Sequence, residues 1–163
     1  LYRRARMKRM RARLGLLSEQ QQDAELVDEM EALWVSQRMD HNRFLRLLSE
    51  WRSDDDQSLQ PLLALAQQPE ALIAWLQRYA LRIRAEAASE PIRQAQMRAV
   101  NPRYVLRNYM AEEVIKEAHQ GDYRPLNALL PLLRHPGDAH PAMSHYAGEP
   151  PAWAEAIHLT CSS

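Results

Sequence analysis

The chain has 163 residues, of which 46% are apolar, and this is enough to bury one hydrophobic core of ordinary size. Its 21 basic and 21 acidic side chains cancel, so the net charge favours neither a nucleic-acid partner nor contact with an acidic membrane surface. Because it has no secretory signal and no apolar stretch near the roughly 20 residues that span a membrane, we expect a soluble, cytoplasmic protein.

The chain opens on a strongly basic segment with no acidic residue in the first fourteen positions. Its cations are Arg3, Arg4, Arg6, Lys8, Arg9, Arg11 and Arg13. The apolar spacing predicts a helix over 2–14 that ends at Gly15. Only Tyr2 could stack on a base here, so nucleic-acid binding is the weakest hypothesis for this segment. The first residue is Leu, and we expect a fragment of a longer protein.

Helical periodicity continues through the next eighty residues. Ser18-Glu19-Gln20-Gln21 matches a capping box and predicts a helix that runs to about Gln37. Asp40 is placed to cap a short helix, and Pro69 and Pro91 each mark the first turn of another. The helices predicted from the capping box onward cover about 19–37, 41–48, 58–65, 69–87 and 91–100.

Asn101-Pro102 predicts the start of a further helix, because Asn caps exposed amides and Pro at the first position loses no bonded donor. That helix carries Leu106, Met110 and Val114 at four-residue steps and stops at Gly121. Asp122 can cap a last helix that runs to 133. Beyond 134, frequent Pro and Gly residues exclude long regular structure and predict a surface tail.

These patterns predict an all-α fold, an irregular helical array with an extended Pro-rich C-terminal tail. No segment shows the period-two alternation of a strand. We expect two regions, a helical one over 1–133 and a Pro/Gly-rich tail over 134–163.

The common nucleotide and metal motifs are missing from the sequence. Its four glycines are single and widely separated, whereas a phosphate cradle needs clustered backbone amides. The histidines His135, His140 and His145 lack the paired short spacing of a zinc site. We therefore expect no catalytic residue, cofactor site or metal site in this chain.

Arg103 and Arg107 are candidate docking residues. They are expected one turn apart near the start of a helix, where positive charge is mildly unfavourable without an acidic partner. Either they are ordinary surface arginines or they contact an anionic group on a partner.

Cys161 is the single cysteine and lies third from the end, in a tail that Trp153 could anchor. It cannot form a disulfide within these residues, so a bridge must reach another chain, a small thiol or a missing part of the protein. The alternative is an incidental thiol on a disordered terminus.

Several long motifs closely resemble the C-terminal part of the selenoprotein O family. They are Asn101-Pro102-Arg103-Tyr104-Val105-Leu106-Arg107-Asn108-Tyr109, Gly121-Asp122-Tyr123, Pro150-Pro151-Ala152-Trp153-Ala154 and Cys161-Ser162-Ser163. Upstream, Met10-Arg11-Ala12-Arg13-Leu14-Gly15-Leu16 and Asp23-Ala24-Glu25-Leu26-Val27-Asp28 are also similar to that family. The resemblance thus spans essentially the whole chain.

The resemblance implies a protein kinase-like fold that transfers AMP from ATP to Ser, Thr or Tyr hydroxyls of other proteins, with Mg or Mn as the divalent metal. It places the nucleotide-binding and metal-binding residues upstream of Leu1, so that this chain alone would be inactive and its first partner would be the missing N-terminal part. It assigns Cys161 a redox role through pairing with a cysteine elsewhere. The alternative from another class is a helical protein-docking module that uses Arg103 and Arg107.

Overall fold

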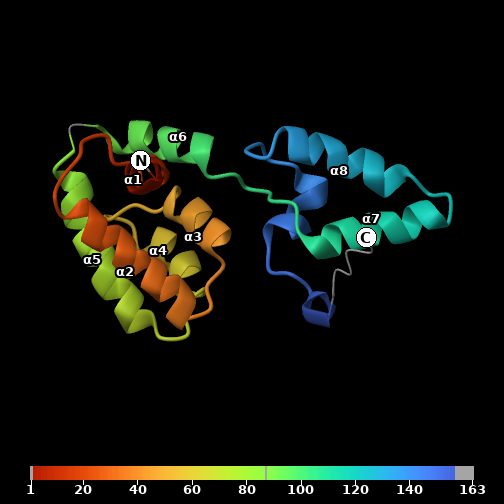
Figure 1. The fold of residues 1–163 in the computed structure, drawn as a ribbon, viewed down its shortest axis with the longest axis horizontal. Helices are drawn as coiled ribbons and strands as arrows, with labels where there is room; N and C mark the ends of the chain where they lie inside the picture. The colour runs from red at the N-terminus through yellow and green to blue at the C-terminus, as the bar shows by residue number, and fades with distance from the viewer. Residues whose placement is uncertain (1, 87, 157–163) are drawn as a thin grey trace. The chain divides into compact units, whose positions relative to one another are not determined.

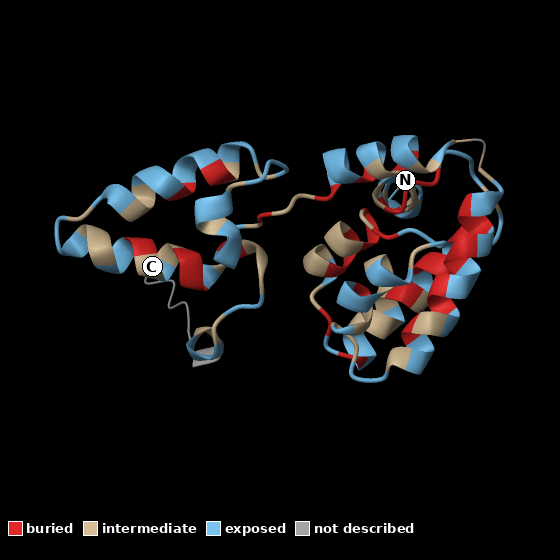
Figure 2. Ribbon diagram, turned by 180° about the vertical axis from the view of Figure 1, so that it is seen from behind, coloured by how far each residue is buried: buried red, intermediate tan, exposed pale blue. Residues whose placement is uncertain are grey.

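The computed structural model describes residues 2–86 and 88–156 (Figure 1). The chain divides into two compact units, and the division along the sequence falls between Asn101 and Pro102. Every regular element in the described residues is a helix, which confirms the predicted all-α class. Figure 2 shows that the buried residues lie on the sides of the helices that face one another within each unit.

The first unit consists of helices with amphipathic faces. They are α1 (Tyr2–Arg13), α2 (Asp23–Ser36), α3 (His41–Leu48), α4 (Asp56–Leu63), α5 (Pro69–Arg84) and α6 (Glu90–Val100). Helix α2 packs along α5, and α1 packs on both α6 and α2. The indole Nε1 of Trp75 donates to the carbonyl of Leu26 at 2.9 Å, which fixes α5 against α2 inside the core.

Several predicted helix ends are confirmed. Gly15 has a φ of +66° and ends α1, as expected for a residue without a Cβ. The Asp40 carboxylate accepts hydrogen bonds from the amides of Asn42 and Arg43 at the start of α3. Helix α5 begins at Pro69, and α6 has Pro91 in its first turn.

The predicted capping box at Ser18 is wrong. Helix α2 begins later, at Asp23, and its N-cap residue Gln22 makes no side-chain cap. The Ser18 hydroxyl and amide instead donate to the Glu86 carboxylate, at 2.9 Å and 3.2 Å for Oε1. Since this partner is 68 residues away, local sequence could not reveal it.

The second unit is a helical hairpin with a folded tail segment. It contains α7 (Asn108–His119), α8 (Arg124–Arg134) and the short 3-10 helices η1 (Pro141–Ala147) and η2 (Ala152–Ala156). Its core consists of Tyr104, Tyr109, Met110, Val114, Leu129, Leu132 and Tyr146. The tail region therefore supplies a core residue, Tyr146. The functional division that we expect between 133 and 134 stays a prediction.

The predicted helix start at Asn101-Pro102 is also wrong. Asn101 ends α6, is fully buried, and donates to the carbonyl of Arg13 at 2.8 Å and to Oγ of Ser49 at 3.2 Å. Because its amide group is used within the first unit, it does not cap a following helix. Residues 102–107 form no helix, α7 starts at Asn108, and Leu106 is 54% exposed rather than buried.

Candidate functional site

Cys161 falls in 157–163, outside the described residues. The tail is described as far as η2, where the Trp153 ring contacts the Tyr109 ring edge-to-face with centroids 6.0 Å apart. Ala154 packs against the second core. Trp153 thus contacts the second core but is 46% exposed, and both its role as an anchor of the tail and the position of the thiol stay predictions.

Arg103 lies in the segment that joins the two units in sequence. Its amide and that of Tyr104 both donate to the carbonyl of Pro136, at 2.7 Å and 3.0 Å, and these bonds tie the segment to the end of α8. The side chain is half-buried, and its Nε is buried without a hydrogen-bond partner among the described residues. A buried donor without a partner is costly, so an acceptor here would stabilise the arginine.

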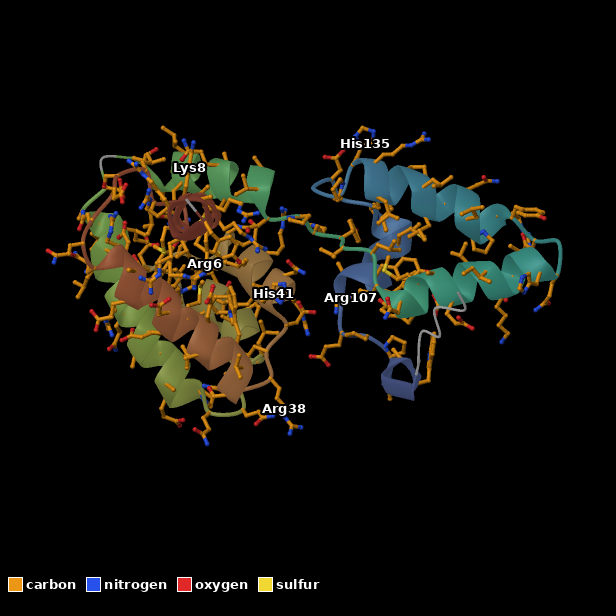
Figure 3. The ribbon with its side chains drawn as sticks, in the orientation of Figure 1. Arg6, Lys8, Arg38, His41, Arg107 and His135 are labelled. Carbon is orange, nitrogen blue, oxygen red and sulfur yellow. The ribbon has the colours of Figure 1, made fainter. Side chains whose placement is uncertain are left out.

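Arg107 is the N-cap residue of α7 and lies at the start of that helix (Figure 3). Burial raises the pKa of the nearby Tyr109 hydroxyl, and the positive charge of Arg107 opposes this shift. The expectation that Arg103 and Arg107 share one helix face is wrong, because Arg103 precedes the helix. Arg107 alone lies at the positive end of the α7 dipole.

An acidic pocket of about 740 Å³ lies in the second unit. It is lined by Glu112, Glu113, Lys116, Glu117, Pro125, Tyr146 and Trp153. The Tyr146 hydroxyl donates to a carboxylate oxygen of Glu113 at 2.8 Å. Burial, followed by this bond and the charge of Glu113, raises the pKa of Tyr146 to about 12. Trp153, which precedes the cysteine tail in sequence, forms part of the wall.

A second concavity, the basic groove, lies between α1 and α6 in the first unit and has a volume of about 910 Å³. Its lining residues are Arg4, Ala5, Lys8, Arg11, Ala12, Gly15, Leu16, Leu17, Glu19, Gln96, Ala99 and Val100. Within the described part of the chain, the side chains of Arg4 and Lys8 make no ion pair or hydrogen bond. Figure 3 shows Lys8 on the side of α1 next to α6.

Other cations of α1 are paired within the first unit. Arg6 binds the carboxylates of Asp28, at 3.2 Å, and Glu31, both on α2. Arg13 donates from Nε to Oδ1 of Asn101 at 3.0 Å. Some cations of α1 thus hold the first unit together, whereas Arg4 and Lys8, which line the groove, are not paired within the described residues.

Sequence reasoning missed this groove because the sequence shows only that α1 is basic, not which side faces α6. The exposed apolar residues on its rim are the signal that could have found it. Leu17, which follows the end of α1, is 57% exposed, and Val100, the last residue of α6, is 43% exposed.

A buried ionic cluster was also missed by the sequence interpretation. Arg82 on α5 contacts Asp23 and Glu86, and its Nη2 donates to the carbonyl of Ser18 at 3.0 Å. Burial alone would raise the pKa of Glu86, but the hydrogen bonds from Arg82 and Ser18 outweigh it and hold this pKa below its usual value. The cluster joins the start of α2 to the end of α5, and we assign it to stability.

Two further properties concern the described residues alone. Across 2–86 and 88–156, no three or more His, Cys, Asp or Glu side chains are grouped so that they could hold a metal ion. In the same residues, no helix has both the length and the apolar character needed to cross a membrane.

The comparisons with known proteins agree with the resemblance seen in the motifs. The family model described as protein adenylyltransferase SelO matches residues 1–134. The protein nucleotidyltransferase YdiU of Myxococcus xanthus (strain DK1622) is 39% identical over 157 residues, which is 96% of this chain and 32% of the relative.

Two more relatives carry the same name, protein nucleotidyltransferase YdiU. That of Thioalkalivibrio sulfidiphilus (strain HL-EbGR7) is 42% identical over 154 residues, covering 94% of this chain and 31% of the relative. That of Hahella chejuensis (strain KCTC 2396) is 38% identical over 165 residues, covering 100% of this chain and 33% of the relative. The chain spans about a third of the length of these relatives. Because the family model covers most of its length, the chain belongs to the protein adenylyltransferase SelO family.

Proposed function

We propose that this chain is the C-terminal third of a protein adenylyltransferase that moves AMP from ATP to Ser, Thr or Tyr hydroxyls of other proteins. The observation that carries the proposal is the family match over residues 1–134, in a chain that covers only 31 to 33% of the relatives compared. The proposed location is the cytoplasm, where ATP and protein substrates are both present.

In the proposed reaction, a hydroxyl oxygen of the substrate attacks the α-phosphorus of ATP. The new P–O bond forms as the bond to the β-phosphate breaks, the hydroxyl proton is released, and pyrophosphate leaves. A divalent metal, Mg or Mn, would neutralise charge on the phosphates. We assign the residues that hold ATP and this metal to the part of the enzyme that precedes this chain in its longer relatives.

The described helices fit a supporting role in such an enzyme. The first unit is held by a buried core and by the Arg82 cluster, so it is a rigid element against which a catalytic part could pack. The kinase-like fold implied for the whole enzyme remains part of the proposal, since this chain contributes only helices in its described residues.

Nucleotide transfer by the complete protein tests this proposal. The protein is incubated with ATP labelled at the α-phosphate, Mg or Mn, and a protein extract, and label on protein is measured by gel autoradiography. We expect labelled protein with α-labelled ATP and none with γ-labelled ATP. Label from the γ-phosphate alone would show a kinase and overturn the proposal.

We further propose that Cys161 is a redox site in the complete enzyme. The thiol would pair with a second cysteine elsewhere in the protein, each losing a proton, while two electrons pass to an oxidant such as glutathione disulfide. The chain has a single cysteine, so no partner is available within these residues. Peptide mass mapping after mild oxidation should give a Cys161 peptide bridged to another cysteine peptide, and a free thiol alone would contradict this role.

The second candidate function is protein docking through Arg103 and Arg107. The observation in its favour is the buried Nε of Arg103, which has no acceptor among the described residues. A carboxylate on a partner would supply one. Arg103→Glu should abolish capture of such a partner while Arg134→Glu, an exposed arginine at the end of α8, should not. Equal capture by both variants would remove this candidate.

A further inference from the structure

We propose that the basic groove between α1 and α6 is the docking site for an acidic, amphipathic helical segment from the part of the enzyme that precedes this chain in its relatives. The inference rests on the proposed function, because it takes the chain to be one third of a longer transferase. It identifies the surface of this chain that would bind the preceding part of the enzyme.

The groove combines an apolar floor with a charged rim, which is the arrangement that receives an amphipathic helix. The small exposed residues Ala5, Ala12 and Ala99 let a partner backbone approach α1 and α6 closely. Leu17 and Val100 add larger apolar surface at the ends of the two helices. A contiguous exposed apolar surface with a polar rim is typical of an interaction site.

The charge on the rim specifies the occupant. Arg4 and Lys8 are one helical turn apart and both line the groove, so they present two positive groups to one side of whatever lies there. The first unit pairs Arg6 with acids of α2 but supplies no partner to Arg4 or Lys8 among its described residues. Carboxylates at four-residue spacing on an incoming helix would match them with charge-assisted hydrogen bonds.

The preceding part of the same enzyme is a better occupant than a second copy of this chain. A symmetric dimer through the groove would bring Arg4 and Lys8 of one copy toward the same cations of the other, and like charges facing each other oppose association. A segment that precedes this chain in the enzyme would be joined covalently to the start of α1, and α1 supplies part of the groove lining. Such a tether gives an effective concentration of the order of millimolar, so even modest contacts would hold it.

The groove is also poorly suited to nucleic acid. Its lining contains no aromatic side chain on which a base could stack, and its apolar floor offers nothing to a phosphate backbone. The single acid on its rim, Glu19, is itself bound by Arg11 at 3.0 Å.

Site-specific photo-cross-linking in the complete protein tests the proposal. A benzophenone amino acid replaces Val100 in the groove, and in a control it replaces Leu81, an exposed residue of α5 outside the groove. After irradiation, peptide mapping identifies what each probe has reached. We expect the Val100 probe to join a peptide from the preceding part of the same molecule, with no increase in protein mass, and the Leu81 probe to give no such product.

Charge reversal then tests the rim. Arg4→Glu with Lys8→Glu should reduce the intramolecular product several-fold. Arg3→Glu with Arg9→Glu, which changes the charge of the same helix equally at exposed positions outside the groove lining, should leave it unchanged. The proposal would be overturned by a product of doubled mass, by an adduct to nucleic acid or by the absence of any product at Val100. It would also be overturned if both double variants lost the product equally.

These outcomes are separate from those of the proposed function, because cross-linking needs neither ATP nor catalysis. AMP transfer without the groove product would overturn only the docking site. The groove product without AMP transfer would overturn only the activity.

Discussion

The Arg82 guanidinium and the Asp23 carboxylate form a buried ion pair, with Nε and Oδ1 2.6 Å apart and side-chain exposures of 3% and 1%. Asp23 is the first residue of α2, and its other oxygen accepts from the amide of Gln20 at 3.0 Å. The pair therefore fixes where α2 begins and holds it against α5.

Removing one member of this pair should destabilise the first unit. Asp23→Asn leaves Glu86 as the carboxylate partner of the buried Arg82 charge, so we expect a loss below the roughly 3–5 kcal/mol that an uncompensated buried charge costs. Urea denaturation should show a correspondingly lower free energy of unfolding. Asp54→Asn, which breaks the exposed pair with Arg52, is the matched control and should leave the transition midpoint unchanged. Equal effects would contradict the burial argument.

The pH dependence of stability should report Glu86. Its pKa is lower in the folded chain than the ordinary glutamate value of about 4.3, so its contribution is present above that value and is lost as the pH falls through the folded pKa. We expect the free energy of unfolding to fall below about pH 4.3 in the native chain and to fall less steeply in Glu86→Gln. Parallel pH curves for the two proteins would show that Glu86 does not contribute.

The two glycines with positive φ should respond differently to alanine. Gly15→Ala places a Cβ 2.7 Å from Cγ of Arg93 and 2.9 Å from Cγ of Met97, in addition to the strain of a φ of +66°. Gly121→Ala meets no atom within 4 Å and carries only the conformational cost of about 1–2 kcal/mol. Denaturation curves should therefore show a larger loss for Gly15→Ala. A loss of equal size would mean that α6 moves aside without cost.

Tyr146 should make the chain sensitive to alkali. Its folded pKa of about 12 lies above the ordinary tyrosine value of about 10, so the stability it provides is present below pH 10 and is lost as the pH rises toward 12. Glu113→Gln removes the negative charge that contributes to this shift, and the Tyr146 pKa should fall. Absorbance titration of tyrosinate near 295 nm measures it, with Tyr146→Phe identifying the step. An unchanged step in Glu113→Gln would contradict the assigned contact.

Local rules predicted the helices and several of their ends. Gly15 and Asp40 act through their own backbone and nearest amides, and both predictions are confirmed. The apolar stripe of α5, with Leu72, Leu76 and Tyr79, is buried as its spacing indicates. Such features depend on neighbours within a few residues, which the sequence shows directly.

The failures share one physical cause, which is competition from distant partners. Asn101 and Ser18 both have side chains suited to capping, but each is bound by groups more than fifty residues away. Because Asn101 is held by its distant partners, no helix starts before Arg103, and Arg103 and Arg107 do not share a helix face. Likewise, no periodic signal marks Tyr146, whose burial depends on how η1 folds back onto α7.

The candidate sites could be predicted only in part for the same reason. The basic character of α1 is visible in sequence, but which cations remain unpaired depends on the acids of α2 and on the position of α6. The redox role of Cys161 rests on family resemblance, and the residue lies outside the described part of the chain.

The location of the nucleotide site is tested by measuring AMP transfer by the complete protein and by residues 1–163 alone, under the same conditions with α-labelled ATP and Mg or Mn. We expect labelled substrate protein with the complete protein and none with residues 1–163. Transfer of label by residues 1–163 would contradict this expectation, because the nucleotide site would then lie within this chain.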